Sequence, residues 1–285
     1  MIHSVLFPLA EGSPGAGARE FAFWLARTTN CHIHFLAVVD IKAFEIPVLG
    51  TPDGFMPTVV APPIQESQTL LEELSAAARE TLSRMAAECA AKGISCSTDL
   101  RTGLPGEAVV QEATAHDLVV MARRGYARSA ATQERIEPLV PQVIRGSVRP
   151  VLVAGREFPG SGEIRNILIA YDGSMHAARA LAIAAVLGGR PEAQCTLITV
   201  AGAEEEGRAT LAPAESYLYH HGLTPKKQIV PGTRPSEIIC DLVASLAADI
   251  LIMGAYGRSP IREVLFGSTT EQVLKQCGCT VVLQS

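Results

Sequence analysis

Short apolar runs alternate with amphipathic stretches along the chain. Runs such as Asp117–Met121 and Asp249–Met253 are typical of strands buried on both faces of a parallel sheet. Between the runs, apolar residues recur every three to four positions, most regularly from Gln65 to Lys92, where Gly93 stands at the expected C-terminal cap. Strands that alternate with helices predict an α/β fold with a parallel sheet.

The first half of the chain carries one full set of these elements. We expect strands at about residues 3–9, 31–39, 94–101, 117–121 and 150–154, and helices at about 17–28, 65–92, 108–115 and 135–147. Residues 41–64 follow neither period, and a connection of that length is typical of a lid or a surface excursion.

The same succession then begins again. The matched segments are Val5–Leu9 with Ile167–Tyr171, the strand ending at Val38 with Cys195–Val200, Arg101–Val110 with Val230–Ile239, Asp117–Met121 with Asp249–Met253, and Pro150–Val153 with Thr280–Leu283. Because the order is preserved, the repeat is a whole βαβαβαβαβ unit and not a short solenoid repeat.

A chain of 285 residues is long enough for two domains of about 140 residues each. We place the domains at residues 1–154 and 164–285, with the Gly- and Pro-containing segment 155–163 as a linker.

Charge and hydropathy remove two classes of partner. The formal net charge is −5 and no Lys/Arg-rich stripe occurs, so we expect no general affinity for nucleic acid. The N-terminal apolar run is too short for a signal peptide, and Ala180–Gly189 ends well before the roughly 20 residues that cross a bilayer. We therefore expect no membrane span and a cytoplasmic protein.

The glycines from Gly254 to Gly267 mark the candidate binding loop. Ligands of open parallel sheets bind at the carboxyl ends of the strands. Gly254 and Gly257 follow a buried strand, and Gly267 opens onto a predicted helix. Bends without side chains let backbone N–H groups approach an anion, and the helix N-terminus adds unpaired donors. The loop is therefore either a phosphate cradle or a plain strand-to-helix turn, and it lacks the Gly-x-x-x-x-Gly-Lys-Ser/Thr pattern of an ordinary P-loop.

Residues after the other strands supply the rest of a nucleotide site. A carboxylate repels phosphate but accepts hydrogen bonds from ribose or base, so Asp172 is expected at the nucleoside end. Val200 and Met253 either flank a purine or belong to the core.

The motif Gly254-x2-Gly257-x9-Gly267-Ser268, paired with Asp172-Gly-Ser, resembles the ATP-binding signature of the universal stress protein family. The resemblance covers the chain twice and implies two tandem doubly wound α/β domains, each a five-stranded parallel sheet of order 3-2-1-4-5. It also implies that the fifth strands of the two domains pair, and that the second domain binds an adenine nucleotide, ATP alone or with Mg²⁺. The implied contacts are Ala170, Tyr171, Asp172, Val200, Met253, Gly254, Gly257, Arg258, Gly267, Ser268, Thr269 and Thr270.

The first domain departs from this motif. Glu137 and Pro138 stand where the second domain has Gly267 and Ser268; a glutamate repels phosphate, and a proline removes an N–H donor. We expect that the first domain has lost this mode of ATP binding or binds another ligand. Its arginines, Arg123, Arg124 and Arg128, leave open an anion site or a solvated basic loop.

Other candidate chemistry is weaker. Cys31, His32 and His34 offer two imidazoles and one thiol, which fall short of a defined zinc pattern, so no metal is expected. The seven cysteines are an odd, scattered set, most of them expected to be buried apolar side chains. No catalytic triad or paired-carboxylate site can be assembled from the sequence.

These observations favour a stress-response or signalling protein whose ATP occupancy biases its conformation or its partner binding. Two alternatives stay open: a slow ATPase of the same fold, for which no general base beside the loop is evident, and a structural dimerisation module without nucleotide. The two domains are expected to pair within the chain, and a further homodimer is open.

Overall fold

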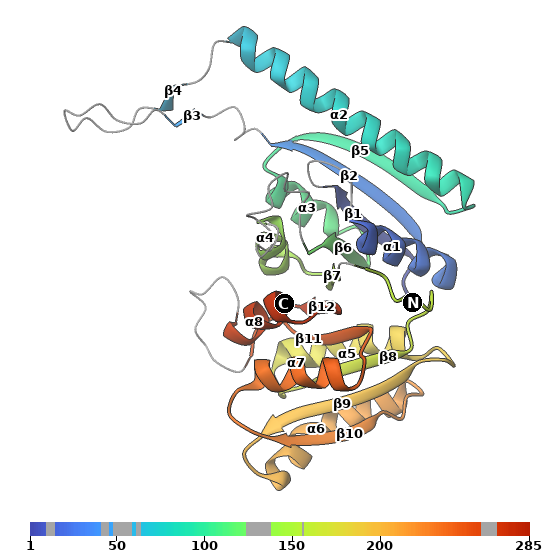
Figure 1. The fold of residues 1–285 in the computed structure, drawn as a ribbon, viewed down its shortest axis with the longest axis vertical. Helices are drawn as coiled ribbons and strands as arrows, with labels where there is room; N and C mark the ends of the chain where they lie inside the picture. Colours follow the sequence, from blue (N-terminus) through green and yellow to red (C-terminus); the bar gives the residue numbers. More distant parts are fainter. Residues whose placement is uncertain are drawn as a thin grey trace, which may run out of the picture.

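One ten-stranded sheet runs through the whole protein (Figure 1). The computed structural model describes residues 1–9, 15–40, 46–47, 59–60, 64–123, 138–155, 157–257 and 267–285. The strand order is β10-β9-β8-β11-β12-β7-β6-β1-β2-β5, so the five strands of each domain form a continuous block.

The first domain contains the elements up to β7. They are β1 (Ser4–Leu9), α1 (Ala16–Thr29), β2 (His32–Asp40), β3 (Ile46–Pro47), β4 (Val59–Val60), α2 (Ile64–Ala91), β5 (Cys96–Gly103), α3 (Pro105–Ala113), β6 (Leu118–Ala122), α4 (Leu139–Gly146) and β7 (Val151–Ala154). The short strands β3 and β4 pair only with each other, within the expected long connection.

The second domain repeats the succession. Its elements are β8 (Asn166–Ala170), α5 (Met175–Gly188), β9 (Gln194–Ala201), α6 (Glu204–His220), β10 (Lys226–Pro231), α7 (Pro235–Ser245), β11 (Ile250–Gly254), α8 (Ser268–Gln276) and β12 (Thr280–Gln284). Counting the five long strands of each domain in chain order, both blocks read 3-2-1-4-5 and are parallel throughout, which confirms the predicted fold.

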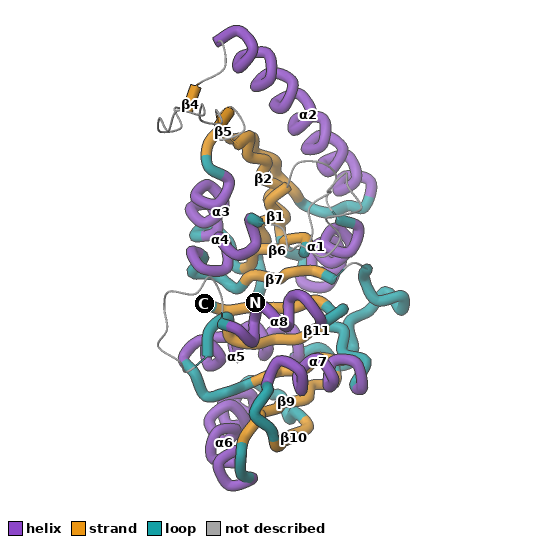
Figure 2. The backbone as a smooth tube through the Cα atoms, turned by 60° about the vertical axis from the view of Figure 1, so that its left-hand side comes forward, coloured by secondary structure: helices purple, strands orange, loops and turns teal. Residues whose placement is uncertain are grey.

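Helices cover both faces of the sheet (Figure 2). Strand residues alternate between two buried clusters: Phe7 and Phe35 face α1 and α2, whereas Leu6 and Leu36 face α3 and α4. In the second domain, α5 and α6 take the first face and α7 and α8 the second. The buried runs of the sequence therefore form strands because both of their faces are covered.

Two helix starts differ from the expected positions. The helix α3 begins at Pro105, three residues before the predicted start, because proline suits the first turn of a helix, where its missing N–H is not needed. The helix α4 begins only at Leu139, after Pro138 at its N-cap, and the earlier part of the predicted helix lies outside the described residues.

The two domains join through their fifth strands, as the family resemblance implied. Strands β7 and β12 pair antiparallel, with Leu152 opposite Val282. Each of these strands pairs within its own domain on one side only, so the join removes an exposed sheet edge from both domains.

Arg123 extends this join beyond the strands. Its side chain is only 8% exposed, and its Nη1 and Nη2 donate to the carbonyl oxygens of Cys277 and Cys279, the latter at 2.5 Å. Arg123 is therefore neither part of a solvated basic loop nor directed at an anion site, which corrects both expectations for this residue.

A second contact ties the linker and the second domain to α1. The indole Nε1 of Trp24 donates to Glu163 at 3.3 Å, and the Arg190 guanidinium lies 4.2 Å from the centre of the Trp24 ring. Phe158 packs edge-on against Phe21, with their ring centres 5.7 Å apart. These contacts hold the domains together on the face of the sheet that α1 and α5 cover, opposite the face that α4 and α8 cover.

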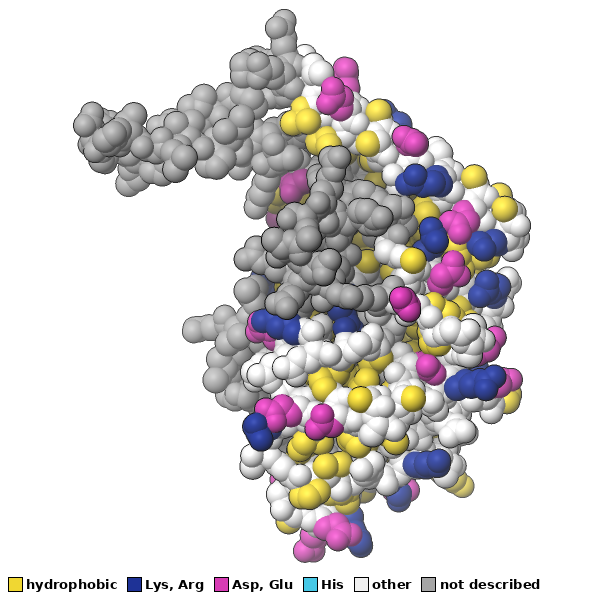
Figure 3. Space-filling model, viewed as in Figure 1, with side chains coloured by type: hydrophobic (Ala, Val, Ile, Leu, Met, Phe, Trp, Pro, Cys, Tyr) yellow, Lys and Arg dark blue, Asp and Glu magenta, His cyan; other side chains and the backbone are white. Residues whose placement is uncertain are grey.

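Three further observations concern the charged surface, the thiols and the lengths of the helices. On the face shown in Figure 3, Lys and Arg are interspersed with Asp and Glu and form no continuous basic stripe among the coloured residues. All seven cysteines are free, and each is buried or half-buried. Among the helices of the described part of the chain, none is long and apolar enough to cross a membrane.

We expect Arg123→Met to lower the free energy of unfolding by about 2–4 kcal/mol, because it removes charge-assisted hydrogen bonds and leaves two carbonyl groups without these donors. Urea denaturation followed by circular dichroism measures the change. The matched control is Arg84→Met on the exposed side of α2, which should change stability by less than about 0.5 kcal/mol. An equal effect of the two substitutions would show that Arg123 does not hold the join.

Candidate functional site

The candidate site lies at the carboxyl ends of β8, β9 and β11 in the second domain. These three strands are neighbours in the sheet, so the segments that follow Ala170, Ala201 and Gly254 emerge at the same edge. The middle of the glycine loop, residues 258–266, lies outside the described residues, and Arg258 with it.

A tight turn fixes Asp172 after β8. Gly173 has a φ of +78°, which favours glycine, and the Ser174 N–H donates to Asp172 Oδ1 at 2.9 Å. Ser174 then caps α5: its Oγ accepts a hydrogen bond from the Ala177 N–H at 3.1 Å. The Ser174 hydroxyl also donates to the Tyr256 carbonyl at 3.4 Å, which connects this turn with the loop after β11.

Two glycines of the motif allow close approach around Asp172. A Cβ on Gly254 would lie 2.6 Å from the Ala177 nitrogen, so only glycine lets β11 pack against the start of α5. A Cβ on Gly257 would lie 3.3 Å from Asp172 Oδ2. The second carboxylate oxygen of Asp172 therefore faces the backbone of the glycine loop.

The loop returns to the sheet at the N-terminus of α8. Gly267 is the N-cap residue, Ser268 is exposed and Thr269 is half-buried. Thr270 is only 2% exposed, and its hydroxyl donates to the Ala255 carbonyl at 2.8 Å. Thr270 thus anchors α8 to the end of β11, while the N–H groups of the first helical turn have no partner within the helix.

The four predicted contacts from the strand ends fall into two groups. Ala170 and Val200 are half-buried at the ends of β8 and β9. Tyr171 and Met253 are each 6% exposed and belong to the two core clusters. The structure thus brings Asp172, Gly254, Gly257, Gly267 and the start of α8 around one edge, and leaves Tyr171 and Met253 mainly as packing residues.

One aromatic pair at this edge was not identified from the sequence. The rings of His176 and Tyr256 meet edge-on with their centres 5.3 Å apart. His176 Nδ1 and the Tyr256 hydroxyl are both buried without a hydrogen-bond partner, and burial raises the pKa of the Tyr256 phenol. The only signal in the sequence is that each residue lies within two positions of a motif residue, Ser174 or Gly257.

The same edge of the first domain is built differently. Arg123 occupies the position of Ala255 and is bonded to the second domain. Pro138, which takes the place of Ser268, precedes α4. Residues 10–14 and 124–137, with Arg124, Arg128 and Glu137, lie outside the described residues.

Comparisons with known proteins agree with this architecture. The model of the universal stress protein family matches the chain twice, at residues 1–155 and 163–284. Universal stress protein Slr1230 of Synechocystis is 26% identical over 278 residues, which cover 92% of each chain. A universal stress protein of Archaeoglobus fulgidus superposes with a TM-score of 0.74 at 20% identity, covering 99% of this chain and 96% of the other, and this likeness shows the fold. With two matches that together span nearly its full length, the chain belongs to the universal stress protein family.

Proposed function

We propose that the second domain binds an adenine nucleotide, ATP alone or with Mg²⁺, and that the protein acts as a nucleotide-responsive stress or signalling protein. The observation that carries this proposal is that Asp172 Oδ2 faces the side of Gly257 where a Cβ would lie, 3.3 Å from it, in the segment that leads to the N-terminus of α8.

The two ends of this arrangement suit the two ends of a nucleotide. Asp172 Oδ1 accepts one backbone hydrogen bond, and a carboxylate has further lone pairs that can accept from ribose hydroxyl groups. The unpaired N–H groups and the dipole at the start of α8 favour phosphate. Half-buried Ala170 and Val200 offer an apolar border for the base.

The site supports binding better than catalysis. Asp172, the carboxylate that faces Gly257, is already hydrogen-bonded to the turn that it starts, which does not suit a general base. We therefore propose that ATP is a bound effector and that any hydrolysis is slow.

Nucleotide occupancy can reach the first domain through the loop after β11. The Ser174 hydroxyl bonds the Tyr256 carbonyl, and the charge of Arg145 in α4 opposes the rise that burial causes in the pKa of Tyr256. The charge of Arg145 thus acts on Tyr256 across the domain join. We propose that a bound nucleotide acts on the first domain through this link.

We expect Gly257→Asp to weaken ATP binding by more than about 100-fold, because a second carboxylate beside Asp172 and the phosphate path adds like-charge repulsion of several kcal/mol. Isothermal titration calorimetry measures the affinity. Gly160→Asp in the linker is the matched control, since a side chain there meets nothing within 4 Å, and it should bind ATP as the parent does. Gly125→Asp, at the corresponding position of the first domain, should also leave binding nearly unchanged. Equal losses from Gly257→Asp and Gly125→Asp would contradict a single site in the second domain.

We expect Asp172→Asn to weaken ATP binding by about 10- to 100-fold and to leave the binding of inorganic tripolyphosphate unchanged or stronger, because the lost charge lies at the nucleoside end. The asparagine keeps an oxygen that can accept from Ser174, so the turn is retained. Competition between the two ligands in calorimetry separates these effects. The control is Asp241→Asn on the exposed side of α7. A parallel loss of tripolyphosphate binding would place Asp172 with the phosphates instead.

A further inference from the structure

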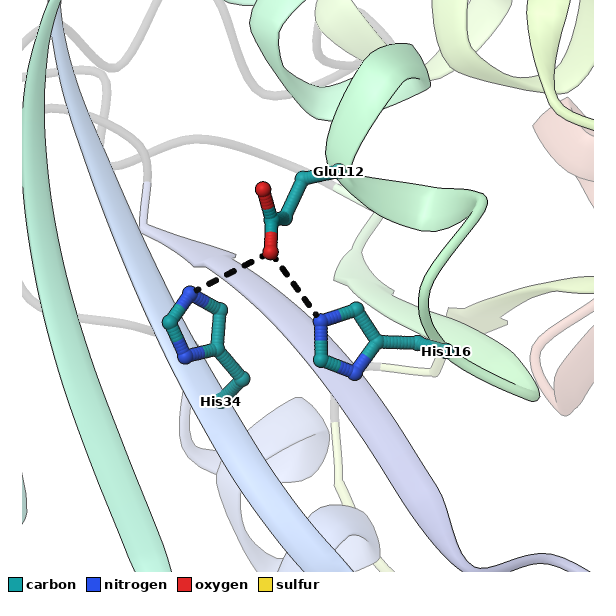
Figure 4. Close-up of side chains that lie close together, drawn as sticks. All are labelled: His34, Glu112 and His116. Carbon is teal, nitrogen blue, oxygen red and sulfur yellow. Dashed lines mark ion pairs between the residues drawn. The ribbon is translucent and has the colours of Figure 1, made fainter.

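Three polar side chains of the first domain point toward one another (Figure 4). They lie near the amino ends of its strands. His34 lies on β2, Glu112 on the last turn of α3, and His116 just beyond that helix. Glu112 Oε1 lies 3.4 Å from His116 Nε2 and 3.8 Å from His34 Nε2. Among the described residues this is the one group of three such donors whose ligand atoms all lie within 4.8 Å of one another.

Each imidazole is held through Nδ1, and its Nε2 faces Glu112 without a well-directed hydrogen bond. His116 Nδ1 lies 2.5 Å from the Ser4 hydroxyl, and His34 Nδ1 lies 2.8 Å from the Ser97 hydroxyl. Each Nε2 faces Glu112, is buried and has no hydrogen-bond partner. His116 is only 8% exposed, so an unpaired nitrogen there carries a real desolvation cost. A bound cation that receives the lone pairs of both Nε2 atoms would remove that cost.

The separations match a small metal ion with imidazole and carboxylate ligands. Zinc takes histidine nitrogens at about 2.0–2.1 Å and carboxylate oxygens at about 2.0–2.2 Å, so two ligand atoms on a tetrahedral ion lie roughly 3.3–3.5 Å apart. The separation of 3.4 Å between Glu112 and His116 falls within that range, and the 3.8 Å separation to His34 requires only a small movement. Metal-bound histidines usually have the second ring nitrogen hydrogen-bonded, and here the Ser4 and Ser97 hydroxyls hold the two Nδ1 atoms.

The local charges also suit a cation. Glu112 Oε2 accepts a hydrogen bond from Arg101 Nη2 at 2.5 Å, which leaves Oε1 facing the histidines. Asp99 pairs with Arg101, and the C-terminal end of α3 adds a negative dipole.

The fold itself does not require these residues. Asp117 and Asp249 each accept two backbone N–H groups at the start of the first strand of their domain, and Pro105 and Pro235 begin the equivalent helices, which fixes the correspondence between the domains. The second domain has Thr196 for His34 and Leu242 for Glu112, and Ala248 stands directly before Asp249 as His116 stands directly before Asp117. Since the same architecture is built there with one hydroxyl and two apolar side chains, the polar cluster is a feature of the first domain alone.

We propose that His34, Glu112 and His116 bind one divalent transition-metal ion, with Zn²⁺ the ion that this donor set suits best. Two imidazoles and one carboxylate leave a fourth position for water or a further ligand. His34 and Glu112 keep 14% and 19% of their side-chain surface exposed, so an ion can enter from solvent.

The expectation of no metal rests on Cys31, His32 and His34, which are neighbours in the chain and fall short of a zinc pattern. In the structure Cys31 is buried in the core on the other face of β2. His32 has both ring nitrogens bonded, to the hydroxyls of Ser95 and Ser97. The candidate site instead combines His34 with two residues that follow it 78 and 82 positions later, and only the strand order brings them together.

Zinc titration of the untagged full-length protein, after treatment with a chelator, tests the proposal. We expect one equivalent of Zn²⁺ to bind in calorimetry. His34→Asn, His116→Asn and Glu112→Gln should each weaken binding by more than about 100-fold, and Ser97→Ala by about tenfold, since it removes only an outer contact of His34. His220→Asn, which removes an exposed imidazole on α6 in the other domain, is the control and should bind as the parent does.

Cobalt substitution distinguishes this site from the free cysteines. Bound Co²⁺ should show d–d absorption without thiolate-to-metal charge transfer, because no ligand is sulfur. Circular dichroism and thermal unfolding in the absence of metal show that each variant is folded. The proposal is overturned if the parent binds no zinc, if the three ligand substitutions bind as His220→Asn does, or if the cobalt spectrum shows sulfur ligation.

Discussion

The antiparallel pairing of β7 with β12 is the constraint on which the rest of the molecule depends. Each of the two strands would otherwise be the exposed edge of a five-stranded parallel sheet, with a row of unpaired backbone groups. Pairing merges the sheets, so that only β5 and β10 remain as outer strands. Close contacts on both sides of the seam depend on it: a Cβ on Gly155 would lie 2.8 Å from the Gly278 carbonyl, and the Ser285 hydroxyl reaches the Ser147 carbonyl at 2.6 Å.

Within this shared frame the two domains have kept the same backbone and changed their chemistry. The second domain retains glycines at the strand ends, where backbone must approach backbone or a carboxylate. The first domain places Arg123 at the position equivalent to Ala255 and uses it to bind the other domain. It also concentrates imidazole and carboxylate groups where the second domain has threonine and leucine. Duplication supplied two copies of one scaffold, and the buried seam allowed each copy to specialise without loss of the common core.

The sequence predicts the architecture well because the architecture depends on local pattern. The fourth strand, expected at residues 117–121, is found at Leu118–Ala122, since a buried apolar run is recognisable without its partners. Helix starts beside prolines are less certain, because Pro105 could end one element or begin the next. Side-chain roles are hardest: Thr270 fits a phosphate loop by position, but its burial and its bond to Ala255 follow from packing that no motif records. The meeting of His34 with Glu112 likewise requires the strand order.

The seam also determines which way each domain faces. All strands within a domain run parallel, but the two blocks run in opposite directions, so the carboxyl ends of the second domain's strands share one rim of the sheet with the amino ends of the first domain's strands. The Asp172 turn and the His34 cluster therefore open at the same rim. Six strand spacings separate β2 from β8, which is about 29 Å along the sheet. A partner that contacts both sites must therefore span this distance along one rim of the sheet.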